Sequence, residues 1–425
     1  MTEDPLTLVA DTPREPPAGT GHWLAPKRFV FLFSDTGGGH RTSAQAVKGE
    51  MERLYGAAAT VELLDVFVAL DQWPFDRFPE WYPSCVGLSG IPWGVGFHLS
   101  DGAKLVKTMS RIVWPYTRSA LCSLLHQHPA DTIVSFHPVP NYALSMSLRH
   151  MGLQVPFAIV AVDLVTTHAA WFVPGADLYF VPTPAAAARA KRWGIAQDQI
   201  RMTGMPARRA FVEAIDLSQS EARAQLGLPQ DRPVVLVVGG SEGMGPLGHV
   251  VRGLARQSAS MHVVVITGRN LALRKELTHL ELSRPVPIGT TVQIEGFVGN
   301  METWMRAADI LVTKAGPNTL AEAFVAGLPL VLFAALPGQE EGNIDHVVLN
   351  GAGLWAPFPR QAARAVVRLV EHPEERHAMA SRSRALARPL ATEQIARGVW
   401  ALAASRSQAM PDYARATGMP HTVRP

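Results

Sequence analysis

Short apolar runs alternate with helix-spaced patterns along most of this chain. Phe29–Phe33 is a continuous apolar run typical of a buried strand, and Ala44, Val47 and Met51 then recur at helical spacing. Comparable runs occur at residues 61–66, 133–136, 157–162, 179–182 and 200–204, and again at 234–238, 263–267, 292–297, 310–313 and 330–333. Strands that alternate with helices predict parallel sheets covered by helices on both faces.

The runs form two series, separated around residues 207–232. A chain of 425 residues is too long for a single core, so we predict an α/β protein with two doubly wound, Rossmann-like domains facing across a cleft. The expected boundaries are a disordered tail at 1–27, a first domain at 28–210, a second domain at 215–385, a helix at 386–404 that crosses back to the first domain, and a disordered tail at 405–425. Functional residues are expected at the carboxyl ends of the strands.

Composition narrows the class of protein. The chain is 47% hydrophobic and 18% charged, and its 39 basic and 36 acidic residues give a net charge of +3, too small to indicate nucleic-acid binding. Two cysteines predict no disulfide framework and a reducing compartment. The N-terminus is acidic and proline-rich, unlike a signal peptide, and no apolar run reaches about 20 residues. We therefore expect a cytoplasmic protein whose membrane contact is peripheral.

The first strand runs into a glycine turn, Ser34-Asp35-Thr36-Gly37-Gly38-Gly39-His40. Gly38 and Gly39 let a substrate approach the backbone at a helix start. The positive helix end keeps His40 neutral, as a general base requires. Asp163, His168 and His137 follow other strands of the same domain and outline an acceptor pocket, although each alone is as well explained as a loop brace.

The second domain contains a stretch suited to a nucleotide-sugar, residues 313–343. A small-residue turn, Ala315-Gly316-Pro317-Asn318, precedes a helix expected to begin at Thr319, and the start of such a helix binds phosphate. Glu322, one turn on, is placed to accept hydrogen bonds from ribose. The next strand ends in a polar cluster that can grip sugar hydroxyls, with Gln339, Glu340 and Asn343 as the candidates.

Two further glycine turns support a ligand cleft in this domain. One contains Gly240, Ser241 and Gly243, and the other contains Arg269. The chain has neither an Asp-x-Asp pair nor Cys/His ligand spacing, so we expect no metal and no other cofactor. The charge of the leaving group would then be neutralised by the helix dipole, backbone N–H groups and Lys314.

The segment from Trp73 to Trp114 interleaves aromatic and basic residues. This pattern suits an element that touches a membrane or grips a lipid, and it fits a helical hairpin packed on the core about equally well. From Arg360 onward there are eleven arginines and five carboxylates. This basic segment could meet an anionic membrane surface or simply be a solvated helix face.

The motifs resemble the group of monogalactosyldiacylglycerol synthases and bacterial diacylglycerol glucosyltransferases, in glycosyltransferase family 28. The matching stretches are SDTGGGHRTSAQA at 34–46, VDLVTTHAAWFVPGADLYFVPT at 162–183, GGSEGMGP at 239–246, TGRN at 267–270, GFVGNMETWM at 296–305 and the block TKAGPNTLAEA…GLPLVL…PGQEEGN. They occur in order over roughly residues 29–400.

The resemblance implies a GT-B fold and an inverting, metal-independent transfer of galactose or glucose from UDP-Gal or UDP-Glc to diacylglycerol. His40 matches the residue that activates the acceptor, with Asp163 or Asp35 as alternatives. Trp93 lies in the region associated with membrane docking and acceptor entry. The implied donor contacts are Phe297 and Val298 to uracil, Gly316, Pro317, Asn318 and Thr319 to the diphosphate, Glu322 to ribose, and Gln339, Glu340 and Asn343 to the hexose.

Two departures from the family pattern bear on the site. Asn318 stands where relatives usually have glycine, and we expect it to keep the turn because asparagine tolerates left-handed geometry. After His137 the chain reads Pro-Val-Pro-Asn where relatives often carry glutamine, which leaves the acceptor open. The alternatives are transfer to a polyprenyl-linked lipid, a UDP-sugar 2-epimerase of the same fold, and a non-catalytic UDP-sugar sensor.

Overall fold

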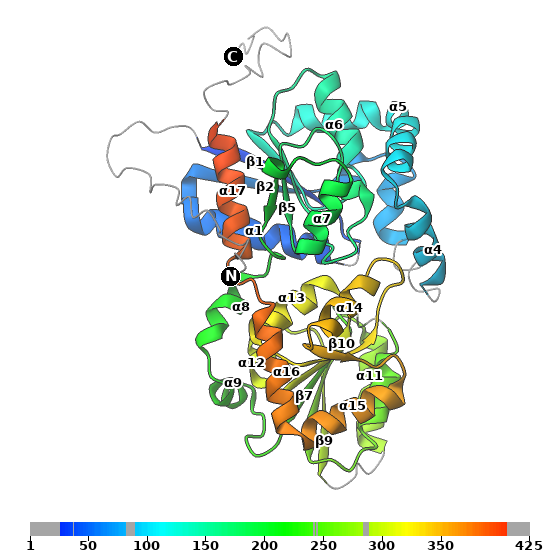
Figure 1. Cartoon of the computed structure of the whole chain (residues 1–425), viewed down its shortest axis with the longest axis vertical. Coiled ribbons are helices and arrows are strands. Elements are labelled where there is room, and N and C mark those ends of the chain that lie inside the picture. The colour runs from blue at the N-terminus through cyan, green and yellow to red at the C-terminus, as the bar shows by residue number, and fades with distance from the viewer. Residues whose placement is uncertain are drawn as a thin grey trace, which may run out of the picture.

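The computed structural model describes residues 26–36, 38–81, 90–240, 243, 245–283 and 289–405. Ser241 lies outside the described residues, as do the predicted tails except for their inner ends. Lys27 already belongs to the first strand, and Ser405 ends the last helix. The chain forms two α/β halves stacked along the long axis of the molecule (Figure 1).

The N-terminal half contains a parallel sheet of six strands in the order β2-β1-β3-β4-β5-β6. Its central strands are buried on both faces, because helices cover both sides of a parallel sheet. The strands are β1 (Lys27–Phe33), β2 (Ala59–Asp65), β3 (Thr132–Ser135), β4 (Phe157–Val160), β5 (Leu178–Val181) and β6 (Ile200–Met202).

The C-terminal half contains a second parallel sheet of six strands, in the order β12-β11-β10-β7-β8-β9. The strands are β7 (Val234–Val238), β8 (Met261–Ile266), β9 (Thr290–Glu295), β10 (Ile310–Lys314), β11 (Leu330–Ala334) and β12 (Gly353–Trp355). All five residues of β7 are buried, as its unbroken valine and leucine run predicts. The prediction of two doubly wound units is confirmed.

Helices connect the strands and cover the sheets. In the N-terminal half they are α1 (Gly39–Tyr55), α2 (Val66–Leu70), α4 (Ile91–Ser100), α5 (Ala103–Gln127), α6 (Asn141–His150) and α7 (Pro184–Arg192). The later helices are α8 (Arg209–Glu213), α9 (Gln219–Leu226), α10 (Leu247–Leu254), α11 (Leu271–Ser283), α12 (Met301–Ala307), α13 (Pro317–Ala326), α14 (Glu341–Leu349), α15 (Pro359–Glu371), α16 (Pro373–Ala385) and α17 (Ala391–Ser405). Single 3₁₀ turns are η1 (Gly56–Ala58), η2 (Phe75–Arg77), η3 (Ala169–Trp171), η4 (Gln197–Gln199) and η5 (Ala214–Asp216).

Each sheet reverses its strand order at one place, and ligands bind outside the strand ends at such switch points. In the N-terminal sheet the switch lies between β1 and β3, where the Gly38–His40 turn and Phe136 follow the strands. In the C-terminal sheet it lies between β7 and β10, where Gly240 and Gly316 follow. Both predicted glycine turns therefore sit at the positions that favour a ligand site.

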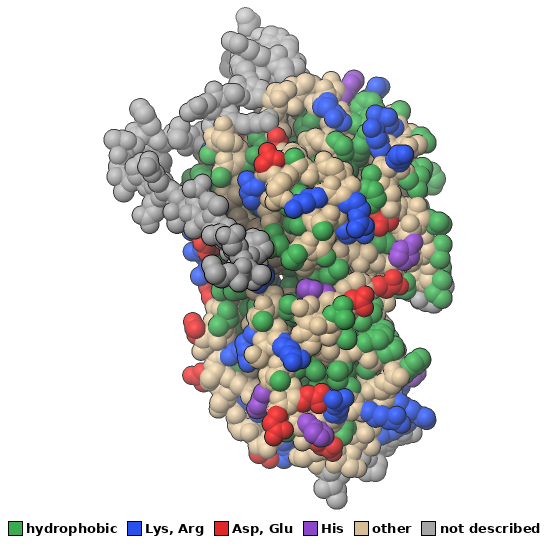
Figure 2. All heavy atoms as spheres, in the orientation of Figure 1, with side chains coloured by type: hydrophobic (Ala, Val, Ile, Leu, Met, Phe, Trp, Pro, Cys, Tyr) green, Lys and Arg blue, Asp and Glu red, His purple; other side chains and the backbone are tan. Residues whose placement is uncertain are grey.

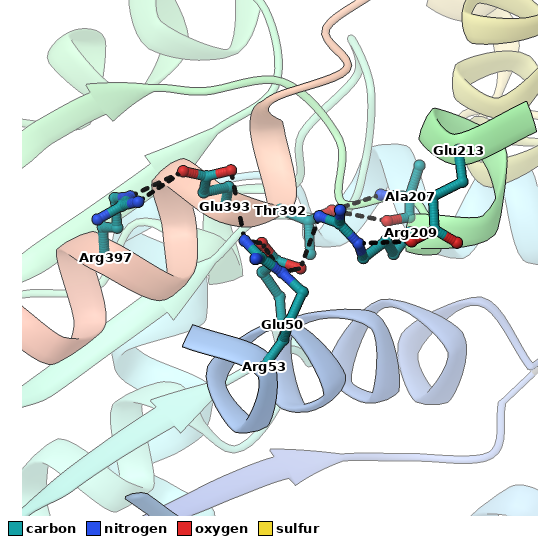
Figure 3. A network of polar contacts seen from close by, with 8 residues as sticks. All are labelled: Glu50, Arg53, Ala207, Arg209, Glu213, Thr392, Glu393 and Arg397. Carbon is teal, nitrogen blue, oxygen red and sulfur yellow. Dashed lines mark hydrogen bonds and ion pairs between the residues drawn. The ribbon is translucent and has the colours of Figure 1, made fainter. Parts of the chain in front are cut away.

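The chain passes between the halves twice, and the two connections are bound to each other. The hydroxyl of Thr392, at the start of α17, donates to the carbonyl of Ala207 at 2.7 Å and accepts from its N–H at 3.0 Å (Figure 3). Further along α17, Trp400 stacks on Tyr55 of α1 with ring centroids 4.0 Å apart. The last helix thus packs on the N-terminal half.

Helix α13 differs from expectation at its start. It begins at Pro317 rather than Thr319, so Asn318 is helical, and its φ is not among the positive values found at described residues. Proline is favoured at the first helical position because its missing N–H has no partner there. The predicted helix start at Thr319 was therefore two residues too late, and the turn is kept without left-handed geometry at Asn318.

Candidate active site

His40, in the first turn of α1, has a fixed orientation in the cleft. Its Nδ1 lies 2.7 Å from the carbonyl oxygen of Phe136, at the end of the neighbouring strand β3. A carbonyl only accepts, so Nδ1 carries the proton and Nε2 carries the lone pair. Burial lowers the pKa of His40 to about 4, against a smaller opposing effect of the Phe136 hydrogen bond and of Asp65. The imidazole is therefore neutral near pH 7, as a general base must be.

His137 is buried next to His40. Its Nε2 lies 3.3 Å from the hydroxyl of Thr36 and its Nδ1 accepts from the N–H of Val139 at 3.3 Å. The rings of His137 and His40 are 4.6 Å apart between centroids. Burial, and then the nearby His40, hold the pKa of His137 well below its usual value. With both ring nitrogens engaged, His137 supports the His40 pocket rather than offering a second lone pair.

Asp163 is buried after β4 and joins the two halves. Its Oδ2 accepts from the indole N–H of Trp171 at 2.6 Å, and its Oδ1 accepts from Nε2 of Gln339, in the C-terminal half, at 2.8 Å. Burial raises the pKa of Asp163 despite these two hydrogen bonds. Both oxygens of Asp163, the alternative candidate base, therefore accept hydrogen bonds from other side chains.

The start of α13 faces the start of α1. Gly316 precedes the helix with no side-chain cap, so the N–H groups of Asn318 and Thr319 have no acceptor within the helix. The side-chain Nδ2 of Asn318 donates to the carbonyl of Gly39 at 3.1 Å, across the cleft. The predicted phosphate site and the residue preceding His40 are therefore in direct contact.

The side chains predicted to hold the hexose gather beside α13, at the start of α14. Nζ of Lys314 lies 2.5 Å from Oε1 of the buried Glu340. Asn343 donates to the carbonyl of Ala315 at 2.8 Å. Among the described residues, Oε1 of Gln339 and Oδ1 of Asn343 have no hydrogen-bond partner. Two buried acceptors without donors suit ligand hydroxyl groups.

The residues predicted to contact uracil, Phe297 and Val298, follow β9, and Arg269, from one of the predicted donor-side turns, lies next to Phe297. The guanidinium of Arg269 lies 5.1 Å from the centre of the Phe297 ring, which is 60% exposed, and Val298 packs partly into the core. Gly240 and Gly243 have positive φ, and a Cβ on Gly240 would lie 3.7 Å from the Lys314 side chain. These turns line the same end of the sheet as Gly316.

Glu322 lies on α13 one turn beyond this helix start, as predicted. Burial raises its pKa to about 7, with Arg208 lowering it and Glu302 raising it. Arg208 reaches this region from the connection between the halves, donating to the carbonyl of Gly299 at 3.3 Å and pairing with Glu302 at 3.3 Å. Glu322 therefore titrates close to neutral pH.

Helix α4, with the half-buried predicted site residue Trp93, packs against the donor side. A Cβ on Gly94 would lie only 2.6 Å from Pro337, and one on Gly338 only 2.9 Å from Phe97. The opposite face of α4 is open, since Ile91 is 62% exposed. The packing of one face agrees with the interpretation as a helix packed on the protein, and the membrane-contacting interpretation stays a prediction.

In the part of the chain that the structure describes, no group of three or more His, Cys, Asp and Glu side chains is placed to hold a metal ion. No helix of the described ranges is both long and apolar enough to span a bilayer.

Sequence reasoning missed three participants: the Phe136 carbonyl, Trp171 and Arg208. A backbone carbonyl leaves no residue-type signal, and it reaches His40 only because β3 lies beside β1. Trp171 stands eight residues after Asp163, inside a stretch already singled out, and its indole N–H needed a buried acceptor. Arg208 lies in the connection, where the pattern predicted no site.

Comparisons with known proteins show the family of the chain. Residues 40–207 match the family model of monogalactosyldiacylglycerol (MGDG) synthase, and residues 234–395 match the glycosyltransferase family 28 C-terminal domain. A probable chloroplastic monogalactosyldiacylglycerol synthase 2 of Oryza sativa subsp. japonica is 35% identical over 387 residues, covering 88% of this chain and 80% of the relative. The chain belongs to the monogalactosyldiacylglycerol synthase family. The prediction of a UDP-sugar-dependent glycosyltransferase is thereby confirmed.

Solved structures of low sequence identity share the fold. MurG of Acinetobacter baumannii superposes with a TM-score of 0.60 at 16% identity, covering 88% of this chain and all of that one. UDP-GlcNAc 2-epimerase of Neisseria meningitidis, bound to UDP-GlcNAc, gives 0.55 at 13% identity over 88% of this chain and all of that one. The architecture of this synthase-family chain is GT-B, as expected. The epimerase shares only the fold with this chain. The family membership of the chain favours a glycosyltransferase over an epimerase.

Proposed function

We propose that this protein transfers galactose from UDP-galactose to the hydroxyl of diacylglycerol at a membrane surface, giving a β-galactosyl lipid. The single observation that carries the mechanism is the fixed tautomer of His40, whose neighbour Gly39 touches the start of the phosphate-binding helix α13. A neutral base and a helix start suited to diphosphate face each other across the cleft. The galactosyl choice is supported by the names of relatives that are 33–35% identical.

The reaction is one displacement. The acceptor hydroxyl oxygen attacks the anomeric carbon from the face opposite UDP, a new C–O bond forms, and the bond from that carbon to the diphosphate oxygen breaks. The hydroxyl proton passes to Nε2 of His40, and the electron pair leaves with UDP. Because the hydroxyl becomes acidic as the new bond forms, a base that is unprotonated and correctly aimed suffices.

The donor half stabilises the leaving group without a metal in this proposal. First-turn N–H groups of α13 and the positive end of its dipole meet the diphosphate. Lys314 adds a cation held in place by Glu340. A Cβ on Gly316 would lie 2.9 Å from Lys314 Nζ, so glycine leaves room for this cation next to the helix start. Gln339 and Asn343 offer their unpartnered oxygens to the hexose hydroxyls.

The lipid acceptor approaches along α4 and α5. The outer face of α4 exposes Ile91, Val95 and Leu99 at four-residue spacing, and α5 continues the apolar surface with Leu105 and Ile112. Figure 2 shows hydrophobic side chains at this edge of the molecule and basic side chains nearby. An apolar helix face flanked by cations suits an anionic lipid surface. Because the opposite face of α4 packs on Pro337, this surface adjoins the donor site.

The deciding experiment incubates the purified protein with labelled UDP-galactose or UDP-glucose, with and without vesicles containing diacylglycerol. We expect labelled galactolipid only with vesicles and UDP-galactose. Labelled glucolipid would change the donor assignment, and transfer to a polyprenyl lipid alone would change the acceptor. Release of a free epimer, or donor binding without turnover, would refute the proposal.

A further inference from the structure

The side chain of Asn318 crosses the cleft from α13 to α1. Its Nδ2 donates to the carbonyl of Gly39 at 3.1 Å and to the hydroxyl of Ser43 at 3.2 Å. Gly39 and Ser43 lie one helical turn apart, and Ser43 is fully buried. A single amide group therefore joins the first turn of the helix that carries His40 to the C-terminal half.

This contact leaves the backbone of Asn318 available to a ligand. Asn318 is the second residue of α13, so its own N–H has no acceptor within the helix and points along the axis toward the diphosphate position. Its side chain points elsewhere, to the N-terminal half. The same residue thus contributes to the donor site through its backbone and contacts the helix of the base through its side chain.

The other end of α1 is held at the junction between the halves. Glu50 is buried and pairs with Arg53 at 2.6 Å and with Arg209, from the connection, at 3.8 Å. Arg53 also lies 3.7 Å from Glu393 of α17 (Figure 3). Ion pairs with both connections fix the C-terminal end of α1. The distance between its N-terminal turn and α13 therefore depends on the Asn318 contact.

We propose that Asn318 is a positioning residue that sets the distance between His40 and the leaving group of the donor. The inference rests on the proposed function only in taking His40 as the base. Removing the side-chain amide leaves the phosphate contacts in place and loosens the first turn of α1. The rate of the chemical step should therefore fall while the affinity for UDP is retained.

The test compares Asn318→Ala and Asn318→Leu, a side chain of similar size that cannot donate to Gly39, with wild type and with Gln45→Ala, an exposed residue on α1. For each variant, kcat for galactosyl transfer, the Kd of UDP by calorimetry, and amide hydrogen exchange over residues 40–44 are measured. We expect kcat to fall about 10-fold in both Asn318 variants, the Kd of UDP to stay within about twofold, and exchange over 40–44 to accelerate. Gln45→Ala should match wild type.

An Asn318→Ala protein with wild-type kcat and wild-type exchange would overturn the proposal. So would a loss of UDP affinity that accounts for the whole loss of kcat, because Asn318 would then act only as a donor ligand. If the Asn318 variants fail to fold, Ser43→Ala removes one of the two partners, and the same criteria apply with a smaller expected loss of about threefold. If wild type itself transfers no galactose, the proposed function fails, whereas exchange and UDP binding still decide the role of Asn318.

Discussion

The starts of α1 and α13 meet between the two halves. They occupy equivalent positions in their sheets, but they offer different chemical groups. Both α1 and α13 follow a central strand at a switch point, and both are preceded by glycine. On the acceptor side the proposed reactive group is a side chain, His40, whose orientation is set by its own half through Phe136. On the donor side the groups proposed to contact the diphosphate belong to the backbone, and the side chain of Asn318 is hydrogen-bonded to the other half.

This difference indicates how the two halves tolerate change. The proposed base acts through one lone pair on His40, so substituting His40 removes proton abstraction. Backbone N–H groups survive any substitution that keeps the helix, so the donor side depends on the surrounding side chains for specificity rather than for phosphate binding.

His40→Ala should reduce kcat by about 10²–10⁴-fold, because the proton acceptor is lost while the donor site is untouched. The KM for UDP-galactose should change little. The wild-type kcat, measured at saturating UDP-galactose, should fall as the pH approaches about 4, where His40 becomes protonated. Steady-state kinetics with vesicles check both statements, and a variant within tenfold of wild type would transfer the role to Asp163 or Asp35.

Gln339→Ala and Asn343→Ala should each lower kcat/KM for UDP-galactose by about 10–100-fold, because each removes a hydrogen-bond acceptor for the hexose. UDP alone has no hexose, so its Kd should stay within about twofold of wild type. Asn350→Ala, an exposed amide on the same half, is the matched control. Equal losses of UDP and UDP-galactose binding would show that these side chains serve the fold of α14 and not the sugar.

The sequence predicted the elements and the candidate residues better than it predicted their partners. Strand patterns and glycine turns predicted that His40 and α13 follow central strands because those signals are local. The bond from Gln339 to Asp163 joins residues 176 positions apart, and no local pattern specifies it. The geometry of Asn318 was predictable, since Pro317 before it is a signal for a helix that has already begun.

Substituting Ile91, Val95 and Leu99 by serine should weaken binding to anionic vesicles by about 10-fold or more, because three partly exposed apolar side chains no longer enter the lipid. These three side chains point away from Pro337, so their substitution should keep the packing of α4 and leave UDP binding unchanged. The control substitutes Leu349 and Leu390, which are 84% and 57% exposed elsewhere. Vesicle flotation measures the effect, and equal loss in the control would show that exposed apolar side chains act non-specifically.

The smallest effect expected is the pH dependence of donor binding through Glu322. Burial raises the pKa of this carboxyl to about 7, so it is mostly neutral at pH 6 and mostly ionised at pH 8. An ionised carboxylate accepts hydrogen bonds from ribose hydroxyls more strongly than the neutral acid, so UDP should bind a few-fold more tightly at pH 8 than at pH 6. Glu322→Gln keeps a hydrogen-bond acceptor that does not titrate, so the contribution of Glu322 to the pH dependence of UDP affinity should disappear. The pH dependence that remains should come from the phosphate groups of UDP. Calorimetry at the two pH values measures the difference, and the same pH dependence in both proteins would place the ribose away from Glu322.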